Sequence, residues 1–470
     1  MSRQSRSYGV AGGFALALFF VLSLIAGLHL EHAGSLIRTL ALAGLYTAVF
    51  AGAAAAYVRL EKPKTGELLF ALGFMAVMMI SRVAMLDFIT ADYNAFLIKW
   101  VDAFRQGGFK MLAQDVGDYN LLYQYVLLLI SKTPLHDLYL IKLLSVVFDY
   151  ALALVMMRAA KEFADERAGL PVLCIVLALP TVLTNGALWC QCDTVYVFFI
   201  ILSLYLLEKN RPALSAASLA VAFAFKLQTI FFFPVVLLGL IHKRYKIRDA
   251  AVFFAAYVLT LVPALIAGRS LIDALMIYAK QSVGQYYDRM SYNAPNFYLF
   301  FPMIEFKGTQ EFPNVRYLPG IDAAATNPYL TEPMMKAIQS AALYGCVILT
   351  LLVVLYWLIH YQEITPDMTL GFALFFAIFL PFVMPKIHDR YFFLADMLSV
   401  LYAARYKNRR FMPLLVVGAS FMCYVPYLMR QNPIDERWLA LMMLLALVIV
   451  SHDLLAGMKK NRALIKGVKA

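Results

Sequence analysis

Residues 87–120 read DFITADYNAFLIKWVDAFRQGGFKMLAQDVGDYN, a polar and acid-rich loop between apolar segments. Five aspartates fall within this loop: Asp87, Asp92, Asp102, Asp115 and Asp118. The apolar segments around it approach the roughly 20 residues that a helix needs to cross a bilayer. The loop therefore follows the end of a membrane span, and its acidic side chains call for a functional explanation.

The composition identifies an integral membrane protein. Of 470 residues, 62% are hydrophobic and 15% are charged, whereas a soluble domain averages roughly 45–50% apolar and 25% charged residues. The repeated apolar segments predict α-helices, because backbone groups without internal hydrogen bonds are too costly in lipid. The net charge of +12 does not indicate nucleic-acid binding, since Lys and Arg cluster in short loops between spans, where they report orientation.

The apolar segments predict an all-α polytopic protein, a bundle of about 14 transmembrane helices that forms one transmembrane domain over residues 1–470. The loop cations then fall on one face, which the positive-inside rule identifies as the cytoplasm together with both termini. The expected spans are 9–29, 34–57, 67–86, 137–159, 169–187, 193–207, 213–226, 228–241, 249–267, 335–360, 368–385, 391–405, 411–429 and 437–456.

The outer loop 87–136 is expected to carry two interfacial helices. Residues 119–131 are too short for a comfortable span, and treating them as one would place the cations of 158–167 and 243–248 outside. The stretch 94–112 sets apolar side chains against charged ones, as a helix on the membrane surface does. Both helices are therefore placed on the outer surface.

Residues 268–334 form the other large outer segment. They show no strong apolar period after Phe301, and five prolines follow that residue, which predicts an irregular flap over the same face. Under this topology the polar motifs of the chain all fall on the outer face. Loops that only connect helices would not gather Asp, Asn, Lys, His and Arg on one side, so this distribution indicates a site there.

Asp87 and Asp92 lie where the span 67–86 ends and are the candidate catalytic carboxylates. An ionised aspartate there could take a proton from an attacking hydroxyl, a general-base role that contributes roughly 10²–10⁴-fold in enzymes. The alternative is a carboxylate in contact with water, or an N-cap of the helix 94–112, a position that Asp92 suits well. The residues alone leave both interpretations open.

Cations in two segments at the membrane edge are candidates for binding an anionic phosphate. Lys226 and Gln228 lie between two short apolar segments, where the lysine either meets a phosphate or only extends toward the headgroups. Residues 385–391 read PKIHDRY and bring Lys386, His388 and Arg390 into a short turn. Such a turn could neutralise a leaving phosphate, and a solvated loop is the alternative.

Three further motifs carry side chains suited to sugar hydroxyls. Residues 117–120 read GDYN, which equally predicts a turn into a helix. Residues 189–194 read WCQCDT, in which the tryptophan alone is explained by the aromatic belt of a membrane. Residues 292–296 read YNAPN, which is also typical of a proline-directed turn. The candidate sugar- or acceptor-binding residues are Asp118, Tyr119, Asn120, Trp189, Gln191, Asp193, Tyr292, Asn293 and Asn296.

As an ordered set, these motifs resemble those of bacterial relatives of the GPI mannosyltransferase II proteins, within the C-type (GT-C) glycosyltransferase superfamily. The resemblance runs from Phe70 to Asp396. Family members commonly show QFDS and HERY, where this chain has QCDT at 191–194 and HDRY at 388–391. Both replacements keep a charge or a hydroxyl, so the resemblance holds.

The resemblance implies a GT-C-like bundle and an inverting transfer from a polyprenyl-phosphate sugar to a glycan, lipid or cell-envelope acceptor. The reaction would take place at the outer face of the bacterial plasma membrane. Asp92 is implied as the favoured base, with Asp87 as the rival, and the motifs GDYN and WCQCDT as surrounding the sugar or acceptor. The sugar stays open, since relatives named for mannose can transfer others. Five side chains are implied around the lipid phosphate: Lys226, Gln228, Lys386, His388 and Arg390.

Two other functions fit a membrane protein with polar outer loops. A flippase for lipid-linked sugars would place ionisable groups near the midplane and show pseudo-repeated halves, whereas here the charges concentrate at one face. A polysaccharide polymerase or ligase would use an Arg-rich outer loop on a diphosphate-linked glycan, and residues 268–334 contain only three arginines.

The transferase mechanism makes one geometric demand and leaves two questions open. The scattered motifs must share one outer cavity, in which an aspartate faces the cations. No cofactor is required, but Asp87 and Asp92 could hold a divalent ion, and the sequence does not decide whether they do. The oligomeric state is equally open.

Overall fold

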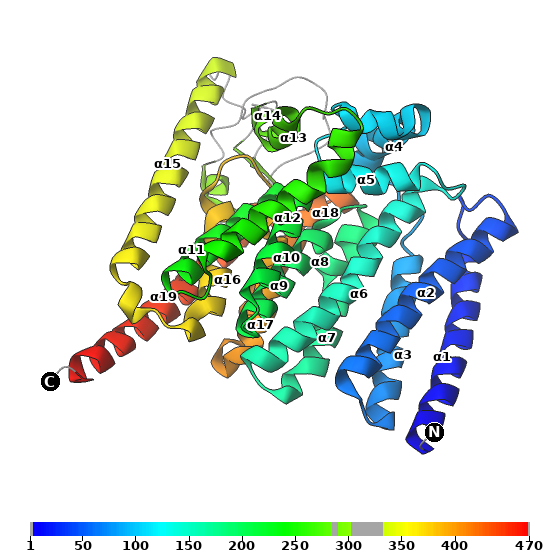
Figure 1. Cartoon of the computed structure of the whole chain (residues 1–470), viewed down its shortest axis with the longest axis horizontal. Helices are drawn as coiled ribbons and strands as arrows, with labels where there is room; N and C mark the ends of the chain where they lie inside the picture. Colours follow the sequence, from blue (N-terminus) through cyan, green and yellow to red (C-terminus); the bar gives the residue numbers. More distant parts are fainter. Residues whose placement is uncertain (1–2, 284–289, 302–331, 469–470) are drawn as a thin grey trace. The chain divides into compact units, whose positions relative to one another are not determined.

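The computed structural model describes residues 3–283, 290–301 and 332–468. The regular secondary structure of these residues is helical apart from two strands of two residues each, so the predicted all-α class is confirmed for them. The chain divides into two compact units, whose elements are labelled in Figure 1. The first contains Met1–Tyr205, Ala224–Lys226 and Ala256–Ile277, and the second contains Leu206–Phe223, Leu227–Ala255 and Tyr278–Ala470.

The first unit is organised around a long helix, α6 (Asp137–Phe163), most of which is buried. The helices α2 (Leu36–Glu61) and α7 (Gly169–Ala178) pack against α6. The helices α1 (Arg3–Leu28) and α3 (Thr65–Val83) pack against each other, and α3 also contacts α7. The buried faces of α2 and α3 are apolar, as expected for helices that cover a central one.

A buried ion pair joins three of these helices. Arg82 of α3 donates through Nε to Asp149 of α6 over 2.7 Å, and both side chains are fully buried. The guanidinium also donates to the carbonyl oxygen of Leu177 in α7. A single charge inside a membrane bundle is costly unless it is paired. The pair therefore stabilises one particular packing of α3, α6 and α7.

The chain bends by 50° after α7, where Pro180 begins the short helix α8 (Pro180–Leu183). Proline has no N–H to continue the preceding helix, so a break at this residue is expected. A π-helical turn, η4 (Thr184–Leu188), follows, and Trp189 comes directly after it. The predicted span 169–187 is therefore a broken helix, and the motif WCQCDT follows its second part.

The second unit is organised around α16 (Thr369–Val383), which packs against α17 (Phe393–Arg405) and α19 (Glu436–Val468). The helix α18 (Met412–Met429) packs against α17 and α19. Almost every side chain of α16 is buried, which explains why its sequence is apolar on all sides. The helix α15 (Glu332–Ile359) contrasts with it, since only 11% of an apolar 18-residue stretch of this helix is buried inside the protein.

A helix lies at each range that the sequence predicts as a span. Of the helices in the described residues, eight are long and apolar enough to cross a membrane, and the bent pair 166–188 makes a ninth if it counts as one span. The expected number of about 14 is reached only if shorter helices also cross. The helices not yet given are α9 (Asp193–Glu208), α10 (Pro212–Phe225), α11 (Phe233–Ile241), α12 (Ile247–Ile266), α13 (Leu271–Leu275) and α14 (Ile277–Val283).

Two short helices form in the loop 87–136, as predicted. The helix α4 (Ile98–Gly107) follows a π-helical turn, η1 (Tyr93–Leu97), and α5 (Leu121–Ile130) follows the motif GDYN. Both helices lie across the upper ends of the long helices of the first unit in Figure 1. An arrangement of this kind suits helices at a membrane surface, and their depth in a bilayer stays a prediction.

A glycine allows the two short helices of this loop to pack closely. Gly117 has a φ of +72°, which L side chains rarely adopt. Its backbone lies so close to the Trp100 ring that a Cβ atom would come within 2.4 Å of it. Glycine satisfies both conditions because it has no Cβ and reaches positive φ readily. The close approach packs the turn before α5 onto α4.

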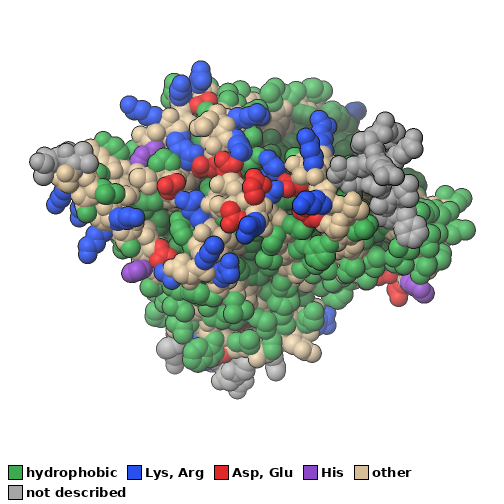
Figure 2. Space-filling model, turned by 90° about the horizontal axis from the view of Figure 1, so that it is seen from below, with side chains coloured by type: hydrophobic (Ala, Val, Ile, Leu, Met, Phe, Trp, Pro, Cys, Tyr) green, Lys and Arg blue, Asp and Glu red, His purple; other side chains and the backbone are tan. Residues whose placement is uncertain are grey.

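Lys and Arg side chains gather on the face that Figure 2 shows from below. In the first unit, Glu61 at the end of α2 pairs with Arg158 and Lys161 of α6. In the second unit, Arg409 pairs with Asp453 of α19. These cations belong to the loops that the positive-inside rule assigns to the cytoplasm. Their grouping at helix ends agrees with that assignment, and the orientation in a membrane stays a prediction.

Most of the predicted flap, 268–334, lies outside the described residues, because 284–289 and 302–331 are not among them. The described segment 290–301 of the flap contains the strand β1 (Ser291–Tyr292) and a short 3₁₀ turn, η6 (Phe297–Phe300). The strand β1 pairs in parallel with β2 (Ile387–His388). This small pairing joins the motif YNAPN to the motif PKIHDRY within the second unit.

Candidate active site

Asp92 lies half-buried in the first unit, with its carboxylate held by two side chains of the motif WCQCDT. Its Oδ2 atom accepts hydrogen bonds from Trp189 Nε1 at 2.9 Å and from Gln191 Nε2 at 3.0 Å. Asp92 occupies the N-cap position of η1, but its side chain makes no capping hydrogen bond. The N-cap interpretation of its carboxylate is therefore wrong, and the side chain faces the motif instead.

A π-helical turn lies next to each of the two segments that meet at the Asp92 carboxylate. Asp92 directly precedes the π-helical turn η1, and Trp189 directly follows the π-helical turn η4. Such turns are rare, and they occur frequently at functional sites because they redirect side chains. Trp189 is only 1% exposed, so its interpretation as a membrane-belt aromatic is wrong. Its indole N–H is instead a buried donor to the carboxylate.

A chain of polar contacts continues from Gln191 away from Asp92. Tyr119 donates its hydroxyl to Gln191 Oε1 at 3.0 Å. The ring of the same tyrosine lies 5.5 Å from the Lys226 ammonium, and the Tyr196 ring lies 5.9 Å from it. Both distances suit cation–π attraction. One network in the first unit therefore brings together predicted site residues from four separate motifs.

Lys226 and Asp193 form a buried ion pair at the end of this network. The ammonium lies 2.5 Å from Asp193 Oδ1, and the two side chains are 7% and 0% exposed. Asn185 donates to the other carboxylate oxygen at 2.8 Å. The interpretation of Lys226 as a lysine that extends to the headgroups is wrong. Its predicted contact with a phosphate, and that of Asp193 with a sugar, stay predictions.

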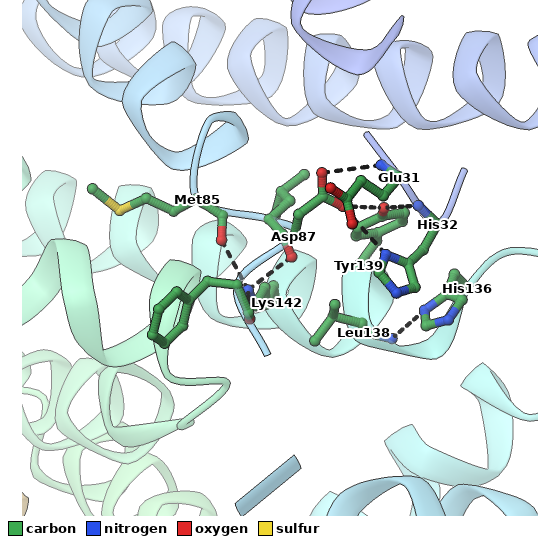
Figure 3. A network of polar contacts seen from close by, with 10 residues as sticks. Glu31, His32, Met85, Asp87, His136, Leu138, Tyr139 and Lys142 are labelled. Atoms are coloured by element: carbon green, nitrogen blue, oxygen red, sulfur yellow. Dashed lines mark hydrogen bonds and ion pairs between the residues drawn. The ribbon is translucent and has the colours of Figure 1, made fainter. Parts of the chain in front are cut away.

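Asp87 belongs to a different network, which Figure 3 shows. Its Oδ2 atom accepts from the backbone N–H of Glu31, and its Oδ1 atom accepts from the Tyr139 hydroxyl at 2.5 Å. The Tyr139 hydroxyl in turn accepts from His32 N at 3.0 Å. Asp87 therefore ties the connection between α1 and α2 to α6, and the two candidate carboxylates have separate partners.

Two histidines border the Asp87 network. His32 Nδ1 lies 3.6 Å from Asp87 Oδ1, and its ring meets the His136 ring edge-on at 5.0 Å. Partial burial, together with the neighbouring His32, lowers the pKa of His136 from its ordinary value. The neutral imidazole is the useful form there, because His136 Nδ1 accepts a hydrogen bond from Leu138 N at the start of α6.

The motif GDYN divides into three different environments. Asn120 is 1% exposed, and its Oδ1 atom accepts from Leu121 N at 2.7 Å. The predicted turn into a helix is therefore confirmed, with Asn120 as the cap of α5. Tyr119 joins the Asp92 network, whereas the side chain of Asp118 is exposed. A direct contact of Asp118 or Asn120 with a sugar stays a prediction.

A cavity of about 300 Å³ lies in the second unit between the start of α15 and the motif PKIHDRY. Its polar lining includes Gln228, Lys336, Gln339 and Lys386, and most of the other lining residues are apolar. Gln228 is 7% exposed, and its Oε1 atom has no hydrogen-bond partner among the described residues. A cavity with two ammonium groups and an apolar wall suits an anionic headgroup attached to a lipid chain.

The side chains of YNAPN support the turn that carries Lys386. The Tyr292 ring stacks on the His388 ring with centroids 4.7 Å apart. Asn296, which is fully buried, donates to the Met384 carbonyl oxygen at 3.3 Å. Lys386 adopts a φ of 61° and donates its N–H to the carbonyl of Met290. Strain at a non-glycine residue persists only when neighbours hold it, so this brace explains the shape of the turn.

The remaining residues of these two motifs have mixed positions. Asn293 is 8% exposed and bridges to His388 through the backbone. The side chains of His388 and Arg390 are half-buried, and Asp389 between them is buried. The interpretation of PKIHDRY as a solvated loop is therefore wrong. The prediction that this turn shares a cavity with Asp92 stays a prediction.

The described residues contain no group of three His, Cys, Asp or Glu side chains placed to hold a metal ion.

Sequence reasoning missed several polar residues inside predicted spans. Lys336 and Gln339 line the cavity three residues apart at the start of α15. Lys142 and Ser145 contact the segments around Asp92 from α6. The available signal was spacing, because polar residues three apart share one helix face. In an apolar span, such a pair indicates a polar partner and not lipid.

Comparison with known proteins adds one finding. The model of Glycosyltransferase family 87 matches residues 126–385, which is more than half of the chain. The matched region includes WCQCDT, Lys226, Gln228 and YNAPN, and it ends directly before Lys386. Asp87 and Asp92 precede it. No curated protein sequence matches the chain.

Proposed function

Since the chain belongs to glycosyltransferase family 87, which is of the GT-C type, we propose that it is an inverting transferase that uses a polyprenyl-phosphate sugar. Membership makes it a multi-pass membrane enzyme with a sugar donor and an acceptor. The acceptor is a glycan, a lipid or a cell-envelope component, and the activity is mannosyltransferase-like. The proposed kinship with GPI mannosyltransferase II proteins rests on the motif order described above.

Asp92 is the proposed base, and its hydrogen bonds with Trp189 and Gln191 are the observation that carries the proposal. Two donors on one oxygen orient the carboxylate before the substrate arrives, which favours proton transfer in a fixed geometry. Asp92 removes the acceptor hydroxyl proton as the acceptor oxygen bonds to the sugar C1. The bond between C1 and the phosphate oxygen breaks on the opposite face, which inverts the configuration.

The cavity beside Lys386 is the proposed place of the donor phosphate. Lys336 and Lys386 supply positive charge, and Gln228 and Gln339 supply amide groups. The apolar side chains around them suit the first isoprene units of the lipid. The leaving phosphate departs already ionised, so these cations stabilise its charge and no acid has to protonate it.

Asp87 is the less suitable base because its two oxygens already bind the Glu31 amide and the Tyr139 hydroxyl. These two bonds use both oxygens of Asp87 to join the connection between α1 and α2 to α6. Asp87 is therefore proposed as a structural residue of the outer loop. The contacts therefore favour Asp92 over Asp87 as the base, a choice that the sequence motif alone leaves open.

The proposed topology has both termini in the cytoplasm and the site at the outer face of a bacterial plasma membrane. Short helices such as α9, α10, α11 and α17 would cross as well, which gives about 14 spans. The support comes from Lys and Arg at one set of helix ends. Cysteine labelling from either side of the membrane at Lys64 and Asp118 tests it, with opposite accessibility expected.

The proposed function is tested with the full chain reconstituted in liposomes. Polyprenyl-phosphate mannose, glucose and arabinose are supplied with n-octyl α-mannoside as the acceptor, and released polyprenyl phosphate is measured. We expect turnover with at least one monophosphate donor and an inverted product. Turnover only with a diphosphate-linked glycan would indicate a polymerase or ligase. Movement of the lipid across the bilayer without consumption would indicate a flippase.

A further inference from the structure

One face of α6 carries four polar side chains that the proposed chemistry does not use. Tyr139, Lys142, Ser145 and Asp149 follow one another at intervals of three, three and four residues, which places them on the same side of a helix. Asp149 holds Arg82 of α3, as described above. The other three contact the two segments that meet at Asp92.

Lys142 holds the segment that leads to Asp92. Its side chain is fully buried, and its ammonium donates to the carbonyl oxygens of Met85, Leu86 and Phe88 at 2.9, 2.8 and 2.8 Å. Figure 3 shows this ammonium directed at the Met85 carbonyl, beside Asp87. A lysine has three N–H donors, so all of them are used on one short stretch of backbone. Tyr139, one turn earlier, binds the Asp87 side chain of the same stretch.

Ser145 holds the segment that carries Trp189 and Gln191. Its hydroxyl donates to the Gln191 carbonyl oxygen at 2.6 Å. Gly186, in the turn before Trp189, lies so close that a Cβ atom there would be 2.5 Å from the Ser145 side chain. The backbone of this segment therefore packs directly against α6.

The two segments are also bonded to each other above α6. Thr90 donates its hydroxyl to the Trp189 carbonyl oxygen at 3.3 Å, and the Trp189 and Gln191 side chains close the contact at Asp92. Three elements therefore converge on one carboxylate, and α6 is the element to which both segments are bonded.

We infer that Lys142 and Ser145 are positioning residues, which set the placement of Asp92 relative to Trp189 and Gln191. This inference rests on the proposed role of Asp92 as the base. Small displacements matter at such a site, because a misplacement of about 1 Å can cost on the order of 100-fold in rate. The competing explanation is that Lys142 only stabilises the end of α3 as a cation at a helix C-terminus.

The test uses the full chain in liposomes, with polyprenyl-phosphate mannose as the donor and n-octyl α-mannoside as the acceptor. Lys142→Met removes the three donors while keeping a similar length, and Lys142→Arg restores a cationic donor. Ser145→Ala removes a single hydrogen bond. Lys161→Met is the matched control, because Lys161 belongs to the same helix but pairs with Glu61 at its other end.

For Lys142→Met we expect kcat per folded molecule to fall by about 10- to 100-fold, with the donor KM within about threefold of the unmutated value. Lys142→Arg should recover part of the loss, and Lys161→Met should leave both constants unchanged. Hydrogen–deuterium exchange should rise in peptides covering 85–92 and 189–191. A role confined to the stability of α3 predicts less folded protein with a normal kcat.

Two results would overturn the inference. Folded Lys142→Met with normal kcat and normal exchange would do so, and if this variant does not fold, the same outcome for Ser145→Ala decides. Full activity of Asp92→Asn would remove both the inference and the base from the proposed function. An inactive Asp92→Asn beside a normal Lys142→Met would remove only the inference, so the two failures are distinguishable.

Discussion

Trp189 donates its indole N–H to the Asp92 carboxylate over 2.9 Å, although 97 residues separate the two in the chain. The contact is formed inside the first unit by a side chain that is almost completely buried. An aspartate in a loop at the end of a span would otherwise be free to rotate in water. The buried donor gives this carboxylate one orientation, which is what a general base requires.

The first prediction separates the two carboxylates of the outer loop. Asp92→Asn should reduce kcat by about 10²–10⁴-fold, because it removes the proposed base, and should leave the protein folded. Asp87→Asn should instead lower the free energy of unfolding by about 1–3 kcal/mol, because it removes the charge of a carboxylate that accepts hydrogen bonds from Glu31 and Tyr139. Sugar transfer and thermal unfolding of both purified variants check this, and normal turnover by Asp92→Asn would contradict it.

The second prediction concerns the buried ion pair of Asp193 and Lys226. Removing one partner leaves an uncompensated charge, so Asp193→Asn and Lys226→Met should each lower the free energy of unfolding by about 3–5 kcal/mol. The double variant should lose less than the sum of the two. A double-mutant cycle on unfolding in detergent measures the coupling. Additive losses would show that the pair contributes nothing as a unit.

The third prediction tests the cavity in the second unit. Lys336→Ala and Lys386→Ala should each raise the donor KM, since a hydrogen bond to a charged group is worth about 1.5–3 kcal/mol. The effect on KM should therefore reach about 10- to 100-fold for each variant. Lys459→Ala, at an exposed position of α19, is the control. An unchanged KM in both cavity variants would remove this cavity from the donor site.

The fourth prediction concerns the close approach of Gly117 to Trp100. Gly117→Ala should destabilise the outer loop, because its Cβ would meet the ring at 2.4 Å and because alanine is strained at a φ of +72°. Gly73→Ala in α3 is the control, since its Cβ would meet nothing within 4 Å and alanine favours a helix. Limited proteolysis of the loop 87–136 reports the difference. Equal protease resistance of the two variants would contradict the packing.

The fifth prediction follows from the lowered pKa of His136. The unfolded chain takes up a proton on this histidine near its ordinary pKa of about 6.5, whereas the folded chain does so only at lower pH. Stability should therefore fall as the pH drops below about 6.5. His136→Asn keeps a capping acceptor for α6 but cannot titrate. Between about pH 7.5 and 5.5, the unfolding temperature of this variant should therefore change less than that of the unmutated protein. An identical pH dependence in both proteins would contradict it.

Sequence patterns predicted the helices well because each span depends on its own composition. The ranges of the expected spans all contain helices, and the outer loop contains the two short ones that were expected. The number of spans was less secure, because length and hydropathy together are met by only eight or nine helices of the described residues. Short helices such as α10 and α11 are ambiguous for any local criterion.

The candidate site was predictable in its members but not in their partners. The motifs contain Asp92, Trp189, Gln191 and Lys226, and the structure of the first unit connects them. Several other residues drawn from the same motifs have structural contacts instead. Asn120 caps a helix and Asn296 braces a turn. A short motif shows which polar side chains are present, but it does not show what each one bonds to.

The amino-acid sequence by itself determined that this is a helical membrane protein with polar motifs between its spans, because hydropathy and loop charge are local properties of the chain. Only the tertiary structure decided that Asp92 meets Trp189 and Gln191, while Asp87 meets Glu31 and Tyr139. Those contacts join residues separated by 52 to 99 positions. The packing of α6 against distant segments creates them, and no local pattern encodes that packing.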